Sequence, residues 1–252
     1  MAGQHSTKAV KRAGSTSGKA RRGLAPDQVD LKTREIVGPQ LEAIDADVPP
    51  TCLTRVGKMV EMIAAWSAIT NLTSEPTDPV ELAFHVIDSL MPLIIARRDG
   101  PAALAAAFGA GKRMLDIGSG AGFPGLVLAA AVPAEVTLTD ARRRRASFLA
   151  TTAEEMGLFG VIIKPGQVTE QGLDGSYDLV TARALDSGSD FHTLARAALK
   201  RGGLALQYVS AGQAVSAGQA SVEGLELFAK IPYELTRGPE NVRRAALVWR
   251  KR

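Results

Sequence analysis

Residues 114–125 read MLDIGSGAGFPG, an apolar segment that leads directly into closely spaced glycines. Because glycine has no Cβ atom, backbone amides in such a segment can approach a ligand closely, and a helix that begins directly afterwards adds free amides of its own. The pattern therefore predicts a strand, a ligand-binding loop and a helix in succession. A tight turn without a ligand is the alternative.

Two kinds of ligand fit the spacing of this loop. Gly120, Gly122 and Gly125 follow the G-x-G-x-x-G pattern of dinucleotide-binding loops, whose amides hold a pyrophosphate. Together with Asp116, Gly118 begins the pattern D-x-G-x-G-x-G, in which the acid compensates the positive charge of S-adenosylmethionine. We favour S-adenosylmethionine, because a carboxylate at this position is poorly suited to a pyrophosphate.

A second acid, Asp140, stands where a cofactor site of either kind needs a carboxylate for the ribose hydroxyls. It also precedes a predicted helix at 142–156, and aspartate is a favoured residue at helix N-caps. One carboxylate can serve both purposes. The sequence therefore leaves cofactor binding and helix capping open for Asp140.

Alternating strand and helix patterns must position these residues. Short connections between such elements indicate an α/β protein with a doubly wound, mostly parallel sheet of Rossmann-like topology. Two later apolar stretches, 225–229 and 245–249, predict an antiparallel hairpin at the edge of the sheet. The predicted strands are 113–117, 135–139, 161–164, 177–182 and 204–209, and the predicted helices are 123–132, 142–156 and 190–199.

The chain divides into three regions by composition. Residues 1–26 form a predicted disordered tail, because they contain basic residues, no acid and almost no apolar side chains. Residues 27–108 show helical spacing, with a helix-start signal in Asp78, Pro79 and Glu81. Residues 109–252 form the strand–helix region. Within it the hexapeptide VSAGQA occurs twice, at 209–214 and 215–220, which we interpret as a surface linker.

The composition of the whole chain excludes several classes of protein. A chain of 252 residues with 46% hydrophobic and 22% charged residues is typical of a soluble globular protein. The single cysteine, Cys52, excludes an intramolecular disulfide, and with three histidines no metal site is expected. The longest apolar run that we identify, 126–134, is too short to span a membrane. We therefore predict a cytoplasmic protein without metal and without membrane insertion.

The net charge of +4 is unevenly distributed. The tail carries +6, so that residues 27–252 carry a net charge of −2. Overall basicity is therefore no indication that the folded region binds nucleic acid. The tail itself fits either a solvated segment or an arm that attracts phosphate.

Three separated motifs resemble those of the bacterial guanine-N7 methyltransferases of small-subunit ribosomal RNA, the glucose-inhibited division protein B family. The glycine loop ends in the specific sequence Gly122-Phe123-Pro124-Gly125, and a predicted strand ends in Ala182-Arg183-Ala184. The N-terminal region carries the third motif, which comprises Trp66, Asn71-Leu72-Thr73 and His85-Val86-Ile87-Asp88-Ser89-Leu90. The resemblance extends over residues 55–209.

The resemblance implies transfer of a methyl group from S-adenosylmethionine to guanine N7 in 16S ribosomal RNA, by a monomeric protein that binds free small-subunit RNA or the assembled subunit. It implies that Asp140 holds the cofactor ribose. The remaining cofactor-binding residues that we expect, from the loop pattern and the resemblance together, are Asp116, Gly118, Gly120, Gly122, Phe123, Val168, Thr169 and Arg183.

The chemistry of guanine N7 sets the demands on such a site. N7 carries an in-plane lone pair and no proton, so that methyl transfer needs no general base and depends on alignment and electrostatics. Arginine commonly donates to the acceptor atoms of guanine. We expect Arg183, at the carboxyl end of a strand, to align the substrate; a salt bridge that caps the strand is the alternative.

A further set of residues is expected to line the site or contact RNA. His85 and Asp88 are three residues apart on a predicted helix and share a face, although a hydrogen-bonded surface pair has the same spacing. The arginine run 142–145 begins a helix, where the macrodipole disfavours cations; both phosphate binding and a solvated face remain open. The full set is Asn71, His85, Asp88, Ser89, Arg142 and Arg143.

The chain departs from the family pattern in two places. The family has a lysine-glycine pair at the end of the fifth strand, where this chain has Leu206-Gln207-Tyr208-Val209. Gln167 replaces a common arginine, and Thr169 a common acid. These departures keep open a methyltransferase that uses S-adenosylmethionine on another substrate. Two further alternatives are a non-catalytic RNA- or ribosome-binding relative and, from the dinucleotide spacing of the glycine loop, an NAD-dependent oxidoreductase.

Overall fold

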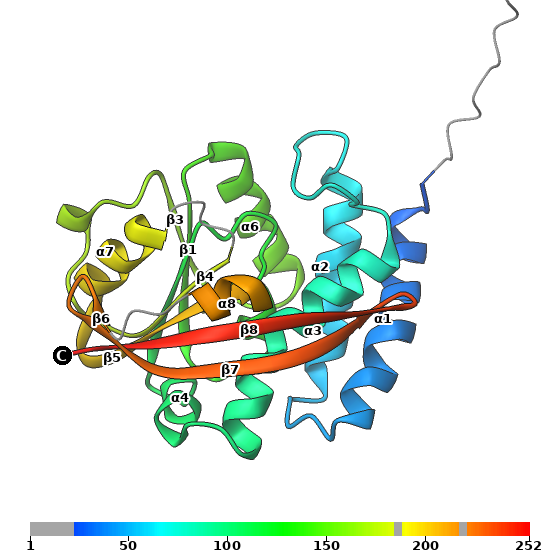
Figure 1. The fold of residues 1–252 in the computed structure, drawn as a ribbon. Helices are drawn as coiled ribbons and strands as arrows, with labels where there is room; N and C mark the ends of the chain where they lie inside the picture. The colour runs from blue at the N-terminus through cyan, green and yellow to red at the C-terminus, as the bar shows by residue number, and fades with distance from the viewer. Residues whose placement is uncertain (1–22, 184–187, 217–220) are drawn as a thin grey trace, which may run out of the picture.

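A computed structural model describes residues 23–183, 188–216 and 221–252 of the chain (Figure 1). The N-terminal region is helical, as predicted, and its helices lie beside the sheet. The basic tail up to residue 22 lies outside the described residues. The N-terminal helices are α1 (Pro26–Ala43), α2 (Thr51–Trp66), α3 (Pro79–Arg98) and α4 (Ala102–Ala107).

The start of α3 follows the predicted signal in part. The Asp78 side chain accepts a hydrogen bond from the Val80 amide at 2.8 Å, and Pro79 occupies the first turn. Glu81 was expected to complete a capping box, but its carboxylate accepts two hydrogen bonds from Arg237, at 2.5 and 2.6 Å. Glu81 therefore joins α3 to the C-terminal part of the chain.

Among the described residues, α3 is the one helix that is long and apolar enough to cross a membrane, with a mean hydropathy of 1.5. No uninterrupted apolar run in α3 is longer than 126–134, because polar residues such as Asp88 interrupt the α3 sequence while its mean hydropathy stays high. Inside the protein, 61% of this apolar window is buried, and α3 packs against α1, α4, α5 and β7. These contacts are those of a core helix.

An eight-stranded sheet forms the centre of the molecule, in the order β3-β2-β1-β4-β5-β8-β7-β6. Its first five strands pair in parallel, as predicted, and the last three are antiparallel. The parallel strands are β1 (Arg113–Ile117), β2 (Glu135–Asp140), β3 (Ile162–Pro165), β4 (Tyr177–Arg183) and β5 (Leu199–Ser210). The helices and the short 3₁₀ helix between them are α5 (Gly125–Ala131), α6 (Arg143–Glu155), η1 (Glu170–Gly172) and α7 (Gly188–Ala198).

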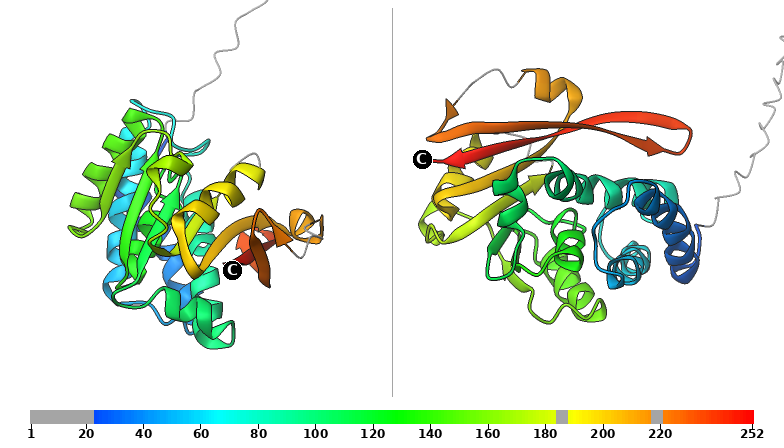
Figure 2. Two further views of the ribbon diagram at one scale, coloured as in Figure 1. Left: turned by 90° about the vertical axis from the view of Figure 1, so that its left-hand side faces the viewer. Right: turned by 90° about the horizontal axis from the view of Figure 1, so that it is seen from below.

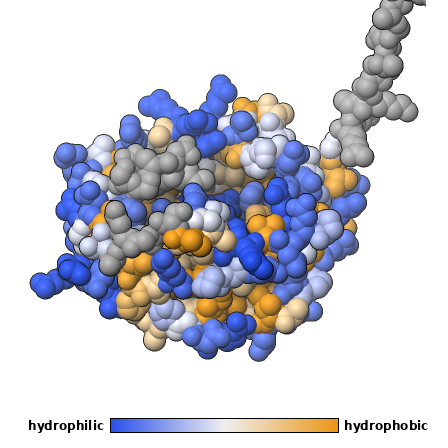
Figure 3. All heavy atoms as spheres, viewed as in Figure 1, coloured by the Kyte–Doolittle hydropathy of each residue, from blue (hydrophilic) through white to orange (hydrophobic). Residues whose placement is uncertain are grey.

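Helices cover both faces of this sheet. One hydrophobic cluster joins the N-terminal helices, α5 and α6 to one face, and a second cluster joins α7 to the other. Figure 2 shows α7 on the opposite side of the sheet from α5 and α6. The outer surface seen in Figure 3 is mostly hydrophilic, with small separate hydrophobic patches.

The predicted C-terminal hairpin is present and is much longer than its apolar stretches. It consists of β7 (Leu225–Arg237) and β8 (Glu240–Lys251), preceded by the short β6 (Ser221–Val222). β8 pairs with β5, and the far end of the hairpin extends to the N-terminal helices (Figure 2). β7 packs on α3, so the hairpin joins the helical region to the sheet.

The first copy of the VSAGQA repeat is not a linker. Val209 and Ser210 end β5, and the rest of the copy begins α8 (Ala211–Ser216). Ser210 and Gln213 form reciprocal hydrogen bonds of 3.2 and 2.9 Å, which is the capping-box arrangement at a helix start. The second copy lies largely outside the described residues.

Candidate active site

The glycine loop, residues 118–124, connects β1 to α5 at the carboxyl edge of the sheet. Gly118 and Gly120 have φ angles of 73° and 57°, in the left-handed region that favours glycine. Part of the loop is held from β2: the Gly118 amide donates to Thr139 Oγ1 at 3.3 Å, and the Ser119 amide to the Thr139 carbonyl at 2.8 Å. The loop is therefore fixed in shape by its neighbouring strand.

Asp140 links the glycine loop to the start of α6. Its Oδ2 accepts from the Gly120 amide at 3.0 Å, and its Oδ1 from the Arg142 amide at 2.8 Å. The side chain is 5% exposed. Asp140 thus caps the helix and also braces the loop, while each carboxylate oxygen retains a lone pair for a ligand.

Asp116 lies below the glycine loop and is fully buried. Its Oδ1 accepts from Thr181 Oγ1 at 2.7 Å, whereas Oδ2 has no hydrogen-bond partner among the described residues. Burial raises the pKa of this carboxyl group, and the Thr181 hydrogen bond opposes the rise. Asp116 therefore does not present its carboxyl group at the surface of the loop, and a ligand held by the loop would not contact it directly.

The last two glycines of the motif are required for packing. A Cβ atom on Gly125 would lie 2.4 Å from Leu138 Cδ2 and 2.5 Å from Asp116 Oδ2. One on Gly122 would lie 2.7 Å from Leu126 Cδ1. Gly125 therefore lets α5 approach the sheet, whereas Gly122, with a φ angle of 92°, also shares the left-handed conformation of Gly118 and Gly120.

A small cavity of ≈ 130 Å³ lies at the carboxyl ends of β2 and β3. Val168 and Thr169, both predicted from the resemblance, line it together with apolar Leu115 and Leu173. We call it the β3-side cavity. Its partly apolar walls have the character of a site for the flat base of a nucleoside.

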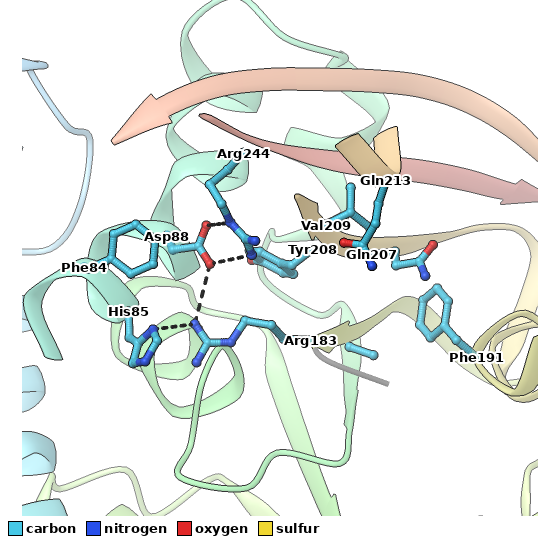
Figure 4. Close-up of a pocket in the computed structure, with 11 residues that line it drawn as sticks. Phe84, His85, Asp88, Arg183, Phe191, Gln207, Tyr208, Val209, Gln213 and Arg244 are labelled. Carbon is cyan, nitrogen blue, oxygen red and sulfur yellow. Dashed lines mark hydrogen bonds and ion pairs between the residues drawn. The ribbon is translucent and has the colours of Figure 1, made fainter. Parts of the chain in front are cut away.

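A larger cavity of ≈ 480 Å³, which we call the arginine pocket, lies at the carboxyl ends of β4 and β5 (Figure 4). It is bounded by α3, α7, α8 and β8. Its lining residues are Phe84, His85, Asp88, Ala182, Arg183, Phe191, Gln207, Tyr208, Val209, Gln213 and Arg244.

Arg183 lies between the glycine loop and the arginine pocket. Its guanidinium carbon lies 5.1 Å from the centre of the Phe123 ring in the glycine loop. Its Nη1 lies 3.4 Å from His85 Nδ1 and 3.5 Å from Asp88 Oδ2. The structure thus brings together four residues that come from all three family motifs.

Asp88 is the centre of the polar network. It is 1% exposed and receives a bidentate ion pair from Arg244, with both N–O distances 3.2 Å. The Tyr233 hydroxyl donates to Asp88 Oδ1 at 2.8 Å. One buried carboxylate therefore holds two guanidinium groups, Arg183 and Arg244, which converge on it from different strands (Figure 4).

The remaining ionisable groups of the pocket are neutral at physiological pH. Burial, together with the positive charge of Arg183, lowers the pKa of His85 to about 3. Burial raises the pKa of the Tyr208 and Tyr233 hydroxyls, so both remain protonated donors. Burial also lowers the pKa of Arg183, but the adjacent Asp88 opposes this. Two cations and one anion leave the lining with one excess positive charge.

The other expected site residues are spread over different surroundings. Ser89 is fully buried, and its hydroxyl donates to the His85 carbonyl at 2.7 Å, so its side chain does not line the pocket. Asn71 is exposed in the loop after α2, where its carbonyl accepts from Arg145 at 3.0 Å. Arg142 and Arg143 are exposed at the start of α6. None of these four residues belongs to the arginine pocket.

Several partners of the polar network around Asp88 were not predicted from the sequence, above all Arg244 and Tyr233 of the C-terminal hairpin. The available signal was the alternation of β8: Arg244 shares a strand face with Ala246 and Val248, which are buried. A charged residue on an apolar strand face indicates a buried ionic partner. No sequence pattern indicates that this partner is Asp88, 156 positions away.

The strand order, the glycine loop after β1 and the antiparallel edge define the Rossmann-like fold of class I S-adenosylmethionine-dependent methyltransferases. A solved structure of an MtNAS mutant in complex with S-adenosylmethionine has a related fold, with a TM-score of 0.51 at 15% identity, covering 90% of this chain and 97% of that chain. The model of the GidB family, described as rRNA small subunit methyltransferase G, matches residues 53–223. The chain belongs to this family, as its motifs predicted.

Curated relatives carry the same description. The ribosomal RNA small subunit methyltransferase G of Nitrosomonas europaea is 33% identical over 154 residues, which cover 61% of this chain and 65% of that protein. The protein of the same name from Sorangium cellulosum is 37% identical over 165 residues, covering 64% and 65% respectively. The chain therefore matches slightly less than two thirds of the length of these relatives.

Proposed function

We propose that this protein transfers a methyl group from S-adenosylmethionine to N7 of a guanine in small-subunit ribosomal RNA. The observation that carries the proposal is the cluster of Arg183, His85, Asp88 and Phe123, which joins the family motifs at one edge of the sheet. Membership of the GidB family supports the same activity.

The residues beside the glycine loop fit the proposed cofactor. Asp140 offers lone pairs for ribose hydroxyls, and the β3-side cavity has apolar residues for a base. The buried Asp116 provides negative charge near the position of a cationic ligand. When bound, S-adenosylmethionine supplies an electrophilic methyl group.

The arginine pocket fits a neutral base that needs alignment and no deprotonation. With a pKa of about 3, His85 is uncharged at neutral pH, and in the tautomer that carries its proton on Nε2 the Nδ1 atom accepts from Arg183 and orients it. Arg183 can donate to guanine O6 while N7 keeps its lone pair for the methyl group. Its contact with Phe123 places this donor next to the glycine loop. Alignment and electrostatics are therefore the contributions of the chain.

The proposed cellular location, oligomeric state and form of the RNA follow from this substrate. We infer that the protein acts in the cytoplasm as a monomer, on free ribosomal RNA or on the assembled small subunit. Within the described residues there is no cluster of three or more histidine, cysteine or acidic side chains that could hold a metal ion. The proposed transfer has no step that requires one.

Transfer of labelled methyl groups tests the proposal directly. Purified protein is incubated with labelled S-adenosylmethionine and, separately, with intact small subunits, naked small-subunit RNA and a small-metabolite pool. We expect label in RNA, at a position sensitive to chemical cleavage at 7-methylguanine. Arg183→Ala should lower the rate about 100-fold or more, because it removes an aligning donor.

Arg201→Ala is the matched control, because Arg201 is an exposed arginine on β5 outside the pocket. Its rate should equal that of the wild type. Label that appears only in metabolites would reject RNA as the substrate, and bound cofactor without any transfer would reject catalysis.

A further inference from the structure

Arg244 has donors that its ion pair does not use. Asp88 engages the Nε and Nη2 atoms of Arg244. The planar guanidinium group has five N–H donors, so Nη1 and one proton of Nη2 remain. Arg244 lines the arginine pocket, and its side chain is 19% exposed. These donors are therefore accessible from the cavity.

The ion pair gives Arg244 one orientation. The Tyr233 hydroxyl and the Arg183 guanidinium hold Asp88 from two other directions, and Asp88 is 1% exposed. A long, flexible side chain thus loses its freedom before any ligand arrives, which lowers the entropic cost of binding. Such preorganisation would serve no purpose for a solvated surface arginine.

The two arginines of the pocket have different neighbours. Arg183 lies against Phe123 of the glycine loop, next to the proposed cofactor position. Arg244 comes from β8 and has no contact of this kind with the glycine loop among the described residues. Since Asp88 neutralises only one guanidinium, an excess positive charge remains in a cavity with no other acidic lining residue.

We propose that Arg244 binds a backbone phosphate adjacent to the target guanine, while Arg183 faces the base. The inference rests on the proposed function, and it assigns to the C-terminal hairpin a direct contact with the substrate. Guanidinium groups match phosphate oxygens in charge and in planar geometry. A base must leave its stack to reach a pocket of this kind, which brings its flanking phosphates to the rim.

Salt dependence of RNA binding tests this assignment. We would measure the dissociation constant of naked small-subunit RNA for the wild type and Arg244→Gln from 50 to 300 mM KCl, at about pH 7.5. Loss of one phosphate contact should reduce the slope of log Kd against log salt by about 0.7. Affinity at the lowest salt should fall about tenfold, and cofactor affinity should stay within about twofold.

Arg243→Gln is the matched control. Arg243 precedes Arg244 on β8, its side chain is 82% exposed, and the change removes the same charge. The slope should remain that of the wild type. Equal loss of slope in both variants would overturn the proposal, because a general effect of charge would then explain binding. An unchanged slope in Arg244→Gln would also overturn it.

Two further measurements keep the test decisive. If Arg244→Gln unfolds because Asp88 loses its bidentate partner, the double variant Asp88→Asn, Arg244→Gln removes both charges and is compared with Asp88→Asn alone. Guanosine 3′,5′-bisphosphate should compete with RNA at least about tenfold better than guanosine, and only when Arg244 is present. Equal competition by the two compounds would assign Arg244 to the base. Methyl transfer to RNA by the wild type, measured in parallel, separates failure of this inference from failure of the proposed function.

Discussion

The two halves of the carboxyl edge are built in different ways. The glycine loop and Asp140 belong to one stretch of about 25 residues, and their contacts join neighbouring strands. The arginine pocket draws on α3, β4 and β8, and its ion pair between Asp88 and Arg244 joins residues 156 positions apart. The first half relies on backbone amides and the second on buried charged side chains. A substitution in one half should therefore impair that half and leave the other half intact.

The largest effect is expected from Asp88→Ala in the arginine pocket. It leaves two buried guanidinium groups without their carboxylate, and breaking a buried ion pair in this way costs about 3–5 kcal/mol. Urea unfolding should show this loss of stability, and methyl transfer should be abolished. Cofactor affinity measured by calorimetry below the unfolding transition should change less than about threefold. A large loss of cofactor affinity would mean that the two halves are coupled.

Gly125→Ala should produce the next largest effect, in the other half. The new Cβ atom would lie 2.4 Å from Leu138 Cδ2, and such overpacking costs about 1–3 kcal/mol. Cofactor affinity should fall, because α5 and the glycine loop must shift. Gly160→Ala is the control, since a Cβ atom there meets nothing within 4 Å. Equal melting temperatures for both variants would contradict the packing role.

Asp140→Ala tests whether Asp140 both stabilises the glycine loop and binds the ribose of the cofactor. It removes the acceptor for the Gly120 and Arg142 amides, at a cost of about 1 kcal/mol of stability. Loss of a ribose contact should weaken cofactor binding about tenfold in calorimetry, which corresponds to about 1.4 kcal/mol. Unchanged cofactor affinity with reduced stability would leave Asp140 as a structural brace alone.

The smallest effect at neutral pH is expected from His85→Gln. In the folded protein the pKa of His85 is about 3, below its value of about 6.5 in the unfolded chain. The unfolded chain therefore binds more protons between these values, and the free energy of unfolding should fall as pH decreases through this range. His85→Gln should reduce this fall while matching the wild type above pH 7.5. Parallel pH profiles of the two proteins would show that the pKa of His85 is the same in the folded and unfolded states.

The contrast between the halves also explains what could be predicted from sequence. The parallel strands, the glycine loop and Arg183 were predicted because local patterns or a family motif encode them. Arg244 and Tyr233 were not, since their function depends on a partner in a helix far away in the chain. Ser89 shows the reverse error: its motif position suggested a site residue, but the helix buries it. The first copy of the VSAGQA repeat was expected in a surface linker, whereas its Ser210 and Gln213 form a capping box at the start of α8.

The C-terminal hairpin has a consequence for synthesis of the protein. Translation completes α1 to α6 and the glycine loop well before β8, which contains Arg244. A nascent chain can therefore assemble its glycine loop while Asp88 still lacks its bidentate partner. β8 must leave the ribosomal exit tunnel before Arg244 can reach Asp88. We therefore expect the glycine loop to fold earlier during synthesis than the arginine pocket.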